Sequence, residues 1–498
     1  MLTLIQADFY KMPHYGMYPE DTTKIYTNFT PRKSRIGGVN EVVVFGIQYF
    51  IKEYLIDQWN KSFFNRPKNE VLLEYKRIMD FTLGKDSIDI AHIAQLHDMG
   101  YLPLKIKALP EGSLCPIGVP CLTITNTVDH AYWLPNFLET ILSTTIWQAM
   151  TSATIAREYR KLLNKYAKET ANNTSTVQWQ GHDFSMRGMS SVESACVSGA
   201  GHLLSFTGTD TVPAIWWLEK YYNANIETDL VGASVPATEH SVMSLGTKDG
   251  EIDTFERLID MYPSGILSIV SDTWNLWTVL TEFMPKLKDK IMKRDGKLVI
   301  RPDSGDPVDI ICGPLNPKRF WESGTQYPIP FGAAEKGVIE ALWDEFGGYI
   351  NEMGYKVLDP HVGAIYGDSI TLERAKSICE RLKAKGFAST NVVLGIGSYT
   401  YQYNTRDTFG FAMKATYGIV NGEERIIWKD PITDDGTKKS AKGLLKVHQE
   451  DGKYRLEDQV SVVTETEGHL QTVFEDGELI IDFTLNEVRK TLLDTLKT

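Results

Sequence analysis

Residues 175–400 repeat one pattern, a short apolar segment that ends in a polar or glycine-containing loop. The segments expected to be strands are 175–179, 229–231, 266–270, 297–300, 362–365 and 391–394. Segment 371–385 places Leu372, Ala375, Ile378 and Leu382 on one face at helical spacing. Repeated strand–loop–helix units predict a parallel sheet. Six or more units in about 225 residues favour an irregular (β/α) barrel over a short open sheet.

The two ends of the chain are rich in strand signals. Segments 24–29, 41–45, 103–109 and 120–125 are β-branched or aromatic runs, and residues 130–170 show helical periodicity. Asp451-Gly452 and Asp476-Gly477 predict two hairpins, and Thr484 with Glu487 forms a capping box before a last helix. We therefore expect an α/β protein with three segments: an N-terminal α+β lobe (1–174), the barrel (175–400), and a C-terminal segment (401–498) completing the β-rich lobe.

Composition excludes several classes of protein. The chain has 498 residues and a net charge of −12, which disfavours a general nucleic-acid surface. No apolar stretch reaches the roughly 18 residues of a membrane span, and the N-terminus does not read as a signal peptide. Five cysteines without a CxxC pair predict free thiols and a reducing, cytoplasmic location. The charged segment 434–440 is expected to be a loop.

The segment Arg301-Pro302-Asp303-Ser304-Gly305 ends an apolar run abruptly. A strand that stops in this way delivers a cation and a carboxylate into a tight turn, a pair that suits a ligand with phosphates and hydroxyls. The plainer interpretation is an ordinary Pro-Asp-Ser-Gly turn with a surface ion pair. The recurrence of similar strand endings favours a site.

These endings share an excess of carboxylates, with arginine and glycine between them. They contain His182, Asp183, Phe184, Arg187, Asp210, Ser234, His240, Asp272, Arg301, Asp303, Gly367, Asp368, Gly397 and Ser398. Carboxylates hold sugar hydroxyls, and arginine and glycine-loop NH groups hold phosphates. The pattern predicts a phosphorylated sugar with Mg²⁺. His182 and His240 could equally be core histidines, and no HExxH, GxSxG or Walker loop is present.

Over nearly its whole length the chain resembles the nicotinamide phosphoribosyltransferase family. The segments that carry the resemblance are short but ordered: Asp8-Phe9-Tyr10-Lys11, His182-Asp183-Phe184, Gly208-Thr209-Asp210-Thr211, Ser234-Val235-Pro236-Ala237, Glu239-His240-Ser241, Ser271-Asp272, Arg301-Pro302-Asp303, Gly367-Asp368 and Lys429-Asp430-Pro431. The resemblance implies transfer of phosphoribosyl from phosphoribosyl pyrophosphate (PRPP) to nicotinamide, with ATP as co-substrate. It also implies a homodimer with shared active sites.

The resemblance also implies roles for individual residues. Tyr10 and Phe184 would stack on the pyridine ring, and Asp210 would accept the carboxamide NH₂. Ser234 would belong to the nicotinamide site, and Arg301 would contact the amide oxygen or the pyrophosphate. Asp272 and Asp303 would hold the ribose hydroxyls and Mg²⁺, and His240 would carry a phosphoryl group from ATP. The remaining residues implied in PRPP and phosphate binding are Arg187, Gly367, Asp368, Gly397, Ser398, Arg406, Lys414, Lys429 and Lys438.

Three positions depart from the family pattern. Gly363 stands where animal members carry arginine, Ser398 makes the glycine loop poorer in glycine, and Ala412 stands where serine is common. These departures bear on phosphate and ATP binding rather than on Asp210, Phe184 or His240.

Three alternatives stay open on the sequence. Nicotinate phosphoribosyltransferase has the same architecture, and Asp210 argues against it because that carboxylate would repel the carboxylate of nicotinate. A barrel glycosidase with two carboxylates fits the late basic residues poorly. A non-catalytic ligand-binding dimer would not need His240, Arg301 and Asp303 together.

Overall fold

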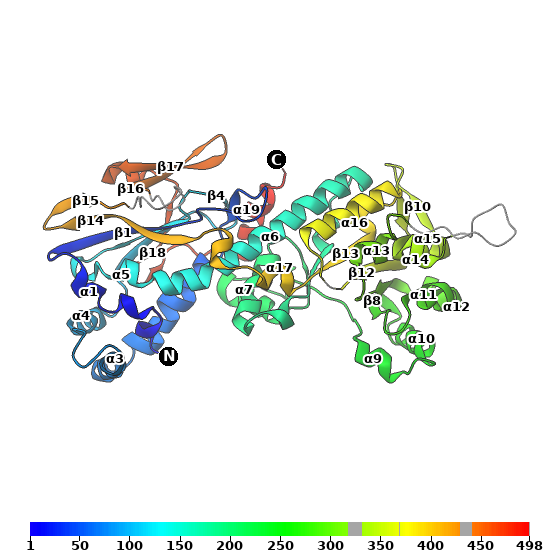
Figure 1. Cartoon of the computed structure of the whole chain (residues 1–498), viewed down its shortest axis with the longest axis horizontal. Coiled ribbons are helices and arrows are strands. Elements are labelled where there is room, and N and C mark those ends of the chain that lie inside the picture. Colours follow the sequence, from blue (N-terminus) through cyan, green and yellow to red (C-terminus); the bar gives the residue numbers. More distant parts are fainter. Residues whose placement is uncertain (317–330, 368, 429–440, 498) are drawn as a thin grey trace. The chain divides into compact units, whose positions relative to one another are not determined.

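The computed structural model describes residues 1–316, 331–367, 369–428 and 441–497 (Figure 1). The chain forms two compact units: unit 1 comprises Met1–Thr154, Trp216–Asn225 and Asn404–Thr498, and unit 2 comprises Ile155–Ile215 and Ile226–Tyr403. The expected loop 434–440 and the predicted site residues Asp368, Lys429 and Lys438 lie outside the described residues. The domain limits at residues 174 and 400 remain a prediction beside these units.

Unit 2 is built on a six-stranded sheet in which every neighbouring pair is parallel. The order is β7 (Gly208–Thr209), β6 (Gly181–Asp183), β13 (Val392–Ile396), β12 (Val362–Tyr366), β9 (Asp295–Arg301) and β8 (Ser264–Val270). Residue Ala233 forms a single bridge with Gly208 on one edge strand, and Ala237 forms one with Ser268 on the other. The same short segment thus touches both edges, so the sheet curls into a half-barrel.

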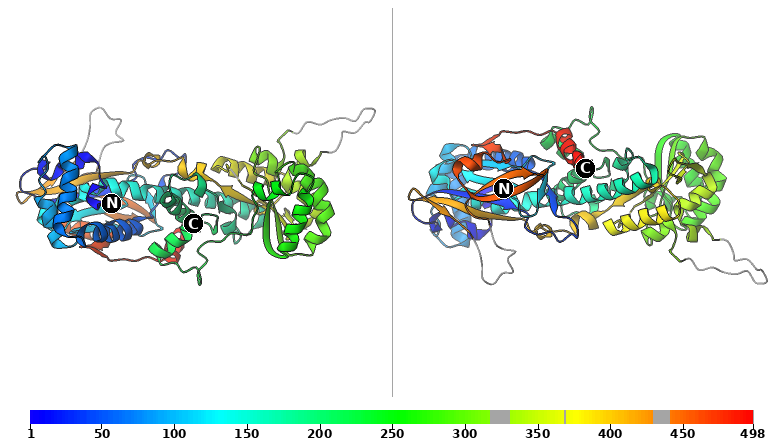
Figure 2. Two further views of the ribbon diagram at one scale, coloured as in Figure 1. Left: turned by 90° about the horizontal axis from the view of Figure 1, so that it is seen from below. Right: turned by 90° about the horizontal axis from the view of Figure 1, so that it is seen from above.

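Strand β12 of unit 2 is short and apolar because both of its faces are covered. All five residues of β12 are buried, as expected for a strand between helical layers. Figure 2 shows helices packed around these strands. The helices are α7 (Val192–His202), α9 (His240–Leu245), α10 (Glu251–Met261), α11 (Leu276–Thr278), α12 (Met284–Met292), α13 (Pro307–Cys312), α14 (Ala333–Lys336), α15 (Val338–Phe346), α16 (Leu372–Ala384) and α17 (Ser398–Gln402). The helix expected over 371–385 is confirmed as α16.

Two of the expected strands are wrong. Segment 175–179 contains a 3-10 helix, Val177–Trp179, because the Ser175 amide turns back onto the Asn173 side chain and β6 begins only at Gly181. Segment 229–231 is not a strand, and the amide of Val231 bonds locally to the carbonyl of Asp229. The sheet contacts of that region fall slightly later, at Ala233 and Ala237. The other four expected strands of this region are confirmed as β8, β9, β12 and β13.

Unit 1 contains a seven-stranded sheet in which every neighbouring pair is antiparallel. Its order is β15 (Glu423–Ile426), β14 (Ala412–Val420), β1 (Thr22–Thr30), β5 (Leu122–Asn126), β3 (Leu104–Ala108), β18 (Gln471–Glu475) and β19 (Glu478–Leu479). Figure 1 shows β15, β14 and β1 side by side, so early and late segments of the sequence share one sheet. Alternate residues of β3 are fully buried, as in a sheet with one wetter face.

Both hairpins that the Asp-Gly pairs predicted are present. The first joins β16 (Leu444–Glu450) to β17 (Lys453–Val460), and the second joins β18 to β19. Asp451 and Gly452 have φ angles of 50° and 74°, and Asp476 and Gly477 have φ angles of 47° and 90°, as a two-residue hairpin turn requires. A smaller pair is formed by β2 (Glu41–Val43) and β4 (Leu114–Pro116).

The helices of unit 1 cover a core that includes Phe29, Phe50, Trp59, Ile106 and Leu122. These helices are α1 (His14–Met17), α2 (Ile47–Tyr49), α3 (Lys68–Thr82), α4 (Ala91–Met99), α5 (Leu134–Phe137), α18 (Val462–Thr466) and α19 (Leu485–Asp494). Two helices contribute residues to both units: α6 (Glu139–Ala171) and α8 (Val212–Tyr222). The capping box of α19 is confirmed, since Thr484 and Glu487 bond reciprocally.

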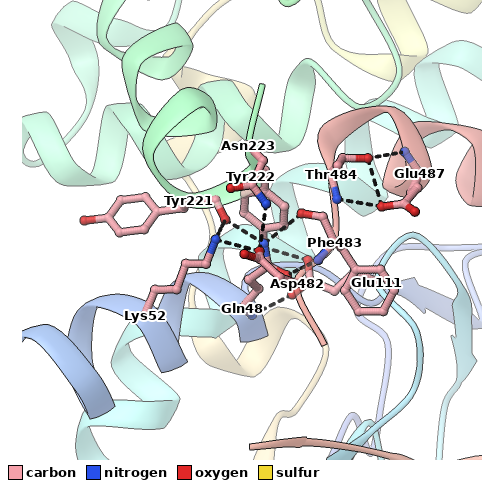
Figure 3. Close-up of polar contacts among 10 residues, drawn as sticks. All are labelled: Gln48, Lys52, Glu111, Tyr221, Tyr222, Asn223, Asp482, Phe483, Thr484 and Glu487. Carbon is pink, nitrogen blue, oxygen red and sulfur yellow. Dashed lines mark hydrogen bonds and ion pairs between the residues drawn. The ribbon is translucent and has the colours of Figure 1, made fainter. Parts of the chain in front are cut away.

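A polar cluster within unit 1 joins its C-terminal segment to segments far earlier in the sequence (Figure 3). The Gln48 side chain donates to the carbonyls of Tyr221 and Phe483 and accepts from the Phe483 amide. Glu111, which is 2% exposed, accepts from the Gln48 amide at 2.7 Å and from the Tyr222 hydroxyl at 2.6 Å. A few shared hydrogen-bond acceptors therefore join segments that are far apart in the sequence.

All five cysteines are free and buried, in agreement with the expected absence of a disulfide framework. Among the described helices, none combines the length and apolarity needed to cross a lipid bilayer.

Candidate active site

Most of the predicted site residues follow the carboxyl ends of the strands of unit 2. Because all strands of the curled sheet are parallel, these ends meet at one edge of the sheet. Phe184 and Arg187 follow β6, Asp210 follows β7, Asp272 follows β8, and Arg301 ends β9. Gly367 follows β12, and Gly397 and Ser398 follow β13. Ser234 lies in the segment that bridges the two edge strands.

Asp210 is the most closely supported carboxylate of the site. Its Oδ1 atom lies 2.8 Å from Nε2 of His182 and accepts from the Ser234 hydroxyl at 2.6 Å. Partial burial pulls the pKa of Asp210 upward, but the hydrogen bonds from His182 and Ser234 and the charges of His182 and Arg301 outweigh it, and the pKa is lowered. The side chain is 42% exposed. Asp210 is therefore an anion that a ligand can reach.

Phe184 is half-buried beside this carboxylate. Its ring centroid lies 4.6 Å from that of His182, at an interplanar angle of 40°. The Phe184 amide donates to the Ile396 carbonyl, which fixes the start of the loop against β13. A Cβ atom on Gly395 would lie 2.7 Å from the Phe184 ring, so a glycine is needed behind it. The ring is thus a supported wall and not a member of the core.

The Arg301 guanidinium makes one hydrogen bond and has one buried NH group without an acceptor among the described residues. Its Nη2 atom donates to the Thr238 carbonyl at 2.6 Å, and its Nε atom is buried without a partner among the described residues. Burial lowers the pKa of Arg301, although Asp303, Asp210 and Asp272 favour its charged form. A buried NH group without an acceptor costs stability unless a ligand supplies one. Arg301 is therefore suited to bind a ligand oxygen.

Asp272 and His240 form a second pair. Only 6% of the Asp272 side chain is exposed, and its Oδ2 atom accepts from the Asp303 amide and the Ser304 hydroxyl. The other oxygen, Oδ1, lies 3.4 Å from Nε2 of His240. His240 is the first residue of α9, and its side chain is 48% exposed. The imidazole is therefore accessible, and its Nε2 atom faces a buried carboxylate oxygen that has no hydrogen-bond partner among the described residues.

Two glycines allow close contacts between neighbouring loops of the site. A Cβ atom on Gly367 would lie 2.8 Å from Oδ1 of Asp303, and one on Gly188 would lie 2.0 Å from the Ser398 hydroxyl oxygen. Gly188 belongs to the 3-10 helix Met186–Gly188, which also carries the exposed Arg187. These contacts bring the loops after β9, β12, β6 and β13 together in pairs.

Three predicted residues belong to unit 1. Tyr10, in the 3-10 helix Phe9–Lys11, is 59% exposed and is not a core residue. Arg406 begins another 3-10 helix and is exposed, and Lys414 lies in β14. Their part in a nucleotide site remains a prediction.

The sequence analysis named His182 and Ser304 without assigning them a role, and it did not single out Thr238. Thr238 acts through its carbonyl on Arg301, and Ser304 acts through its hydroxyl on Asp272. Backbone groups leave no side-chain signal, so Thr238 could not have been found. His182 had a signal, because it stands two residues before Phe184 and extended backbone places alternate side chains on the same face.

The described residues hold no cluster of three or more His, Cys, Asp or Glu side chains of the kind that cages a metal. The site combines an ionised acid beside an aromatic ring, a buried arginine, and further carboxylates near an exposed histidine. Such a set can bind a flat polar ring on one side and a sugar phosphate on the other.

More than half of the chain matches a family of phosphoribosyltransferases. Residues 179–478 match the model of the Nicotinate phosphoribosyltransferase (NAPRTase) family. In overall fold the chain is similar to a nicotinate-nucleotide pyrophosphorylase from Pyrococcus furiosus, with a TM-score of 0.58 at 15% identity over 99% of this chain and 96% of that one. It is also similar to human Nicotinic Acid Phosphoribosyltransferase, with a TM-score of 0.53 at 14% identity over 98% and 93% of the two chains.

Sequence similarity then narrows the class. Residues 2–106 match the model of the Nicotinamide phosphoribosyltransferase N-terminal domain. The chain is 52% identical to a nicotinamide phosphoribosyltransferase of Acinetobacter baylyi over 98% of this chain and 97% of that protein. It is 37% identical to one of Mycoplasma pneumoniae over 88% and 94% of the two chains. The chain belongs to the nicotinamide phosphoribosyltransferase family.

Proposed function

We propose that the protein transfers the phosphoribosyl group of PRPP to nicotinamide, giving nicotinamide mononucleotide and pyrophosphate in NAD salvage. The observation that carries this proposal is the environment of Asp210. Both donors in the described residues end on Oδ1, which leaves Oδ2 to accept a hydrogen bond from a carboxamide NH₂. The curled sheet and its bridging segment then act as an irregular (β/α) barrel, with this acid at its rim.

The same geometry disfavours nicotinate as the substrate. A carboxylate of the ligand placed about 5 Å from Asp210 would be repelled by roughly 3 kcal/mol at an effective dielectric constant of 20. Because Asp210 is 42% exposed, solvent screening reduces this penalty to about 1–2 kcal/mol, or roughly ten- to thirtyfold in affinity. The amide pays no such penalty and gains a charge-assisted hydrogen bond.

In the reaction the pyridine nitrogen attacks C1 of the ribose while the bond from C1 to the pyrophosphate oxygen breaks. Positive charge develops on the sugar and negative charge on the leaving group. The Asp303 carboxylate would stabilise the sugar side, and the Arg187 and Arg301 guanidinium groups would stabilise the pyrophosphate. No protein nucleophile is needed, because the substrate nitrogen attacks directly, and positioning of the ring and sugar supplies much of the rate.

We propose that Mg²⁺ binds at this site together with the phosphates of the substrate. Mg²⁺ characteristically binds one or two carboxylates together with substrate phosphates and waters, and it rarely needs an all-protein cage. Asp303 and Asp272 are the carboxylates that would hold it, and Asp272 is already held by two donors through Oδ2. When bound, the ion neutralises charge on the pyrophosphate.

We include an ATP-dependent step on His240 in the proposal. Because Nε2 faces the Asp272 carboxylate, Nδ1 is the nitrogen proposed to attack the γ-phosphate of ATP. The step transfers the phosphoryl group to Nδ1 and releases ADP. Labelled ATP should mark the protein, and His240→Ala should lose both the label and the ATPase activity. Label that persists in the variant would place the acceptor elsewhere.

We also propose a homodimer in which Tyr10, Arg406 and Lys414 serve the site of the second copy. Tyr10 is an exposed aromatic residue in a segment that carries the family motif, which supports a role in binding rather than in the core. Lys429 and Lys438, which lie outside the described residues, keep their predicted phosphate role as part of this proposal. A cytoplasmic location also belongs to it, in keeping with five free thiols.

The substitution Asp210→Ser tests the function directly. It should lower kcat/KM for nicotinamide by roughly ten- to thirtyfold and narrow the preference over nicotinate by a similar factor. Asp249→Ser, which changes an exposed aspartate of unit 2, is the matched control and should leave both values unchanged. Equal kcat/KM for the two pyridines in the unmodified protein would remove the proposal's support.

A further inference from the structure

His182 is one of two described side chains that hydrogen-bond to Asp210, and Ser234 is the other. The His182 side chain is only 12% exposed, and its Nε2 atom lies 2.8 Å from Oδ1 of Asp210. An ionised carboxylate can only accept hydrogen bonds, so Nε2 must carry the proton in this pair. The hydrogen bond is therefore directed from His182 to Asp210.

We propose that His182 is a positioning residue that sets the specificity for the amide: its Nε2–H occupies one oxygen of Asp210 and turns the other toward the carboxamide. This inference rests on the proposed function, because it assigns the means by which Asp210 selects nicotinamide. His182 acts on the ligand indirectly, through the orientation of the Asp210 carboxylate and the position of the Phe184 ring.

Convergence of the two donors gives the pair its selectivity. His182 and Ser234 both donate to Oδ1, and Oδ2 accepts no hydrogen bond from the described residues. A carboxylate free to rotate would present either oxygen, and a protonated one would present a hydroxyl that nicotinate could accept. With Oδ1 held by two donors, the carboxylate stays ionised and only an NH donor matches Oδ2.

The surrounding residues hold the His182 ring rigidly. A Cβ atom on Gly208 would lie 2.7 Å from Nδ1 of His182, so the ring packs directly against the β7 backbone. Phe184, in the loop after β6, lies beside the ring at a centroid distance of 4.6 Å. The Asp210 amide also donates to the Asp183 carbonyl at 2.9 Å, which fixes the backbone of the acid relative to β6.

Two variants separate the donor of His182 from its ring. His182→Phe keeps an aromatic ring against Phe184 but removes the donor, whereas His182→Gln keeps an NH group near the position of Nε2 but removes the ring. His361→Leu is the matched control, since His361 pairs with Asp359 at 2.7 Å before β12, at the amino-terminal edge of the same sheet. The measurements are kcat and KM for nicotinamide, nicotinate and PRPP.

The donor role predicts that His182→Phe reduces the ratio of kcat/KM for nicotinamide over nicotinate at least tenfold, roughly the worth of one charge-assisted hydrogen bond. The change should appear mainly in KM for nicotinamide, with KM for PRPP within about threefold of the unmodified value. His182→Gln and His361→Leu should keep the ratio within about threefold.

The pH profile gives a readout that a purely structural role would not move. His182 is among the groups that hold the pKa of Asp210 low, together with Ser234 and Arg301. Its loss should raise the pKa of Asp210, so the acid limb of kcat/KM for nicotinamide should move to higher pH in His182→Phe. The limb of His182→Gln should stay in place.

The outcomes distinguish the inference from the function beneath it. If the unmodified protein makes no nicotinamide mononucleotide, the proposed function fails. If it does so selectively while His182→Phe keeps both ratio and acid limb, the inference alone is overturned. Should His182→Phe not fold, His182→Gln decides: a retained ratio supports the donor role, and a lost ratio assigns the effect to the ring and contradicts it.

Discussion

Replacing Glu111 by glutamine is expected to remove a specific pH dependence from the stability of unit 1 (Figure 3). Burial raises the pKa of Glu111 to about 7 from an ordinary value of 4.5, although the Gln48 amide, the Tyr222 hydroxyl and the Gly46 amide donate to it. Between these two values the folded state keeps a proton that the unfolded state has lost. Stability from this group therefore increases as the pH falls through 7 and is fully present below 4.5.

The size of the effect follows from the two pKa values. Between about pH 8 and about pH 5.5, Glu111 should add about 2 kcal/mol to the free energy of unfolding, at 1.36 kcal/mol per unit of pKa difference. Glutamine binds no proton in this range. On acidification, the free energy of unfolding of the unmodified protein should thus rise by about 2 kcal/mol relative to that of Glu111→Gln. Any effect of the substitution that does not depend on pH cancels in this comparison.

The assay is urea unfolding at the two pH values, read by hydrogen exchange of peptides from β1 and β5 so that unit 1 is followed by itself. Glu487→Gln is the control within the same C-terminal segment. The backbone amide and side chain of Thr484 lower the pKa of Glu487, so its contribution is lost only below its ordinary value of 4.5. That control should show no change between the two pH values. A change below about 0.5 kcal/mol for Glu111→Gln, or one of opposite sign, would refute the reasoning.

Three further outcomes follow from the site. Gly367→Ala should raise KM for PRPP several-fold with little change in KM for nicotinamide, because the new methyl group would displace the Asp303 carboxylate; an unchanged KM for PRPP in steady-state kinetics would contradict this. Gly188→Ala should lower the melting temperature by a clash worth about 1–3 kcal/mol, and adding Ser398→Gly should restore it; additive effects would show that the two residues do not touch. Arg301→Lys should lower kcat/KM at least tenfold, because lysine lacks the planar fork that reaches the Thr238 carbonyl and a ligand together; full activity would remove Arg301 from the site.

Local chemistry made much of the fold predictable. Strands such as β12 are apolar throughout because both faces are covered, and the Asp-Gly pairs appear at both expected hairpins with positive φ angles. Segment 175–179 failed because a polar turn before Gly181 outweighs the apolar residues that resemble a strand. The bridging of both edge strands by residues 233–237 depends on contacts distant in sequence and could not be seen in a local pattern.

The sequence allowed the site residues to be predicted more readily than the hydrogen bonds between them. Asp210, Phe184, Arg301 and Asp272 all follow strand ends, so a reader of the sequence can place them at one edge of a parallel sheet. The convergence of His182 and Ser234 on one oxygen requires side-chain directions, which a sequence does not contain. The cluster around Glu111 joins residues more than 400 positions apart in sequence, such as Gln48 and Phe483, and no motif marks it.

A competition reaction tests the central claim most directly. The purified protein is given PRPP, Mg²⁺ and equal concentrations of nicotinamide and nicotinate, and the two mononucleotides are separated by mass while pyrophosphate is measured. An ionised, oriented Asp210 predicts that the amide mononucleotide exceeds the acid by at least tenfold, with one pyrophosphate released per product. Equal amounts of both products, or an excess of nicotinate mononucleotide, would contradict it.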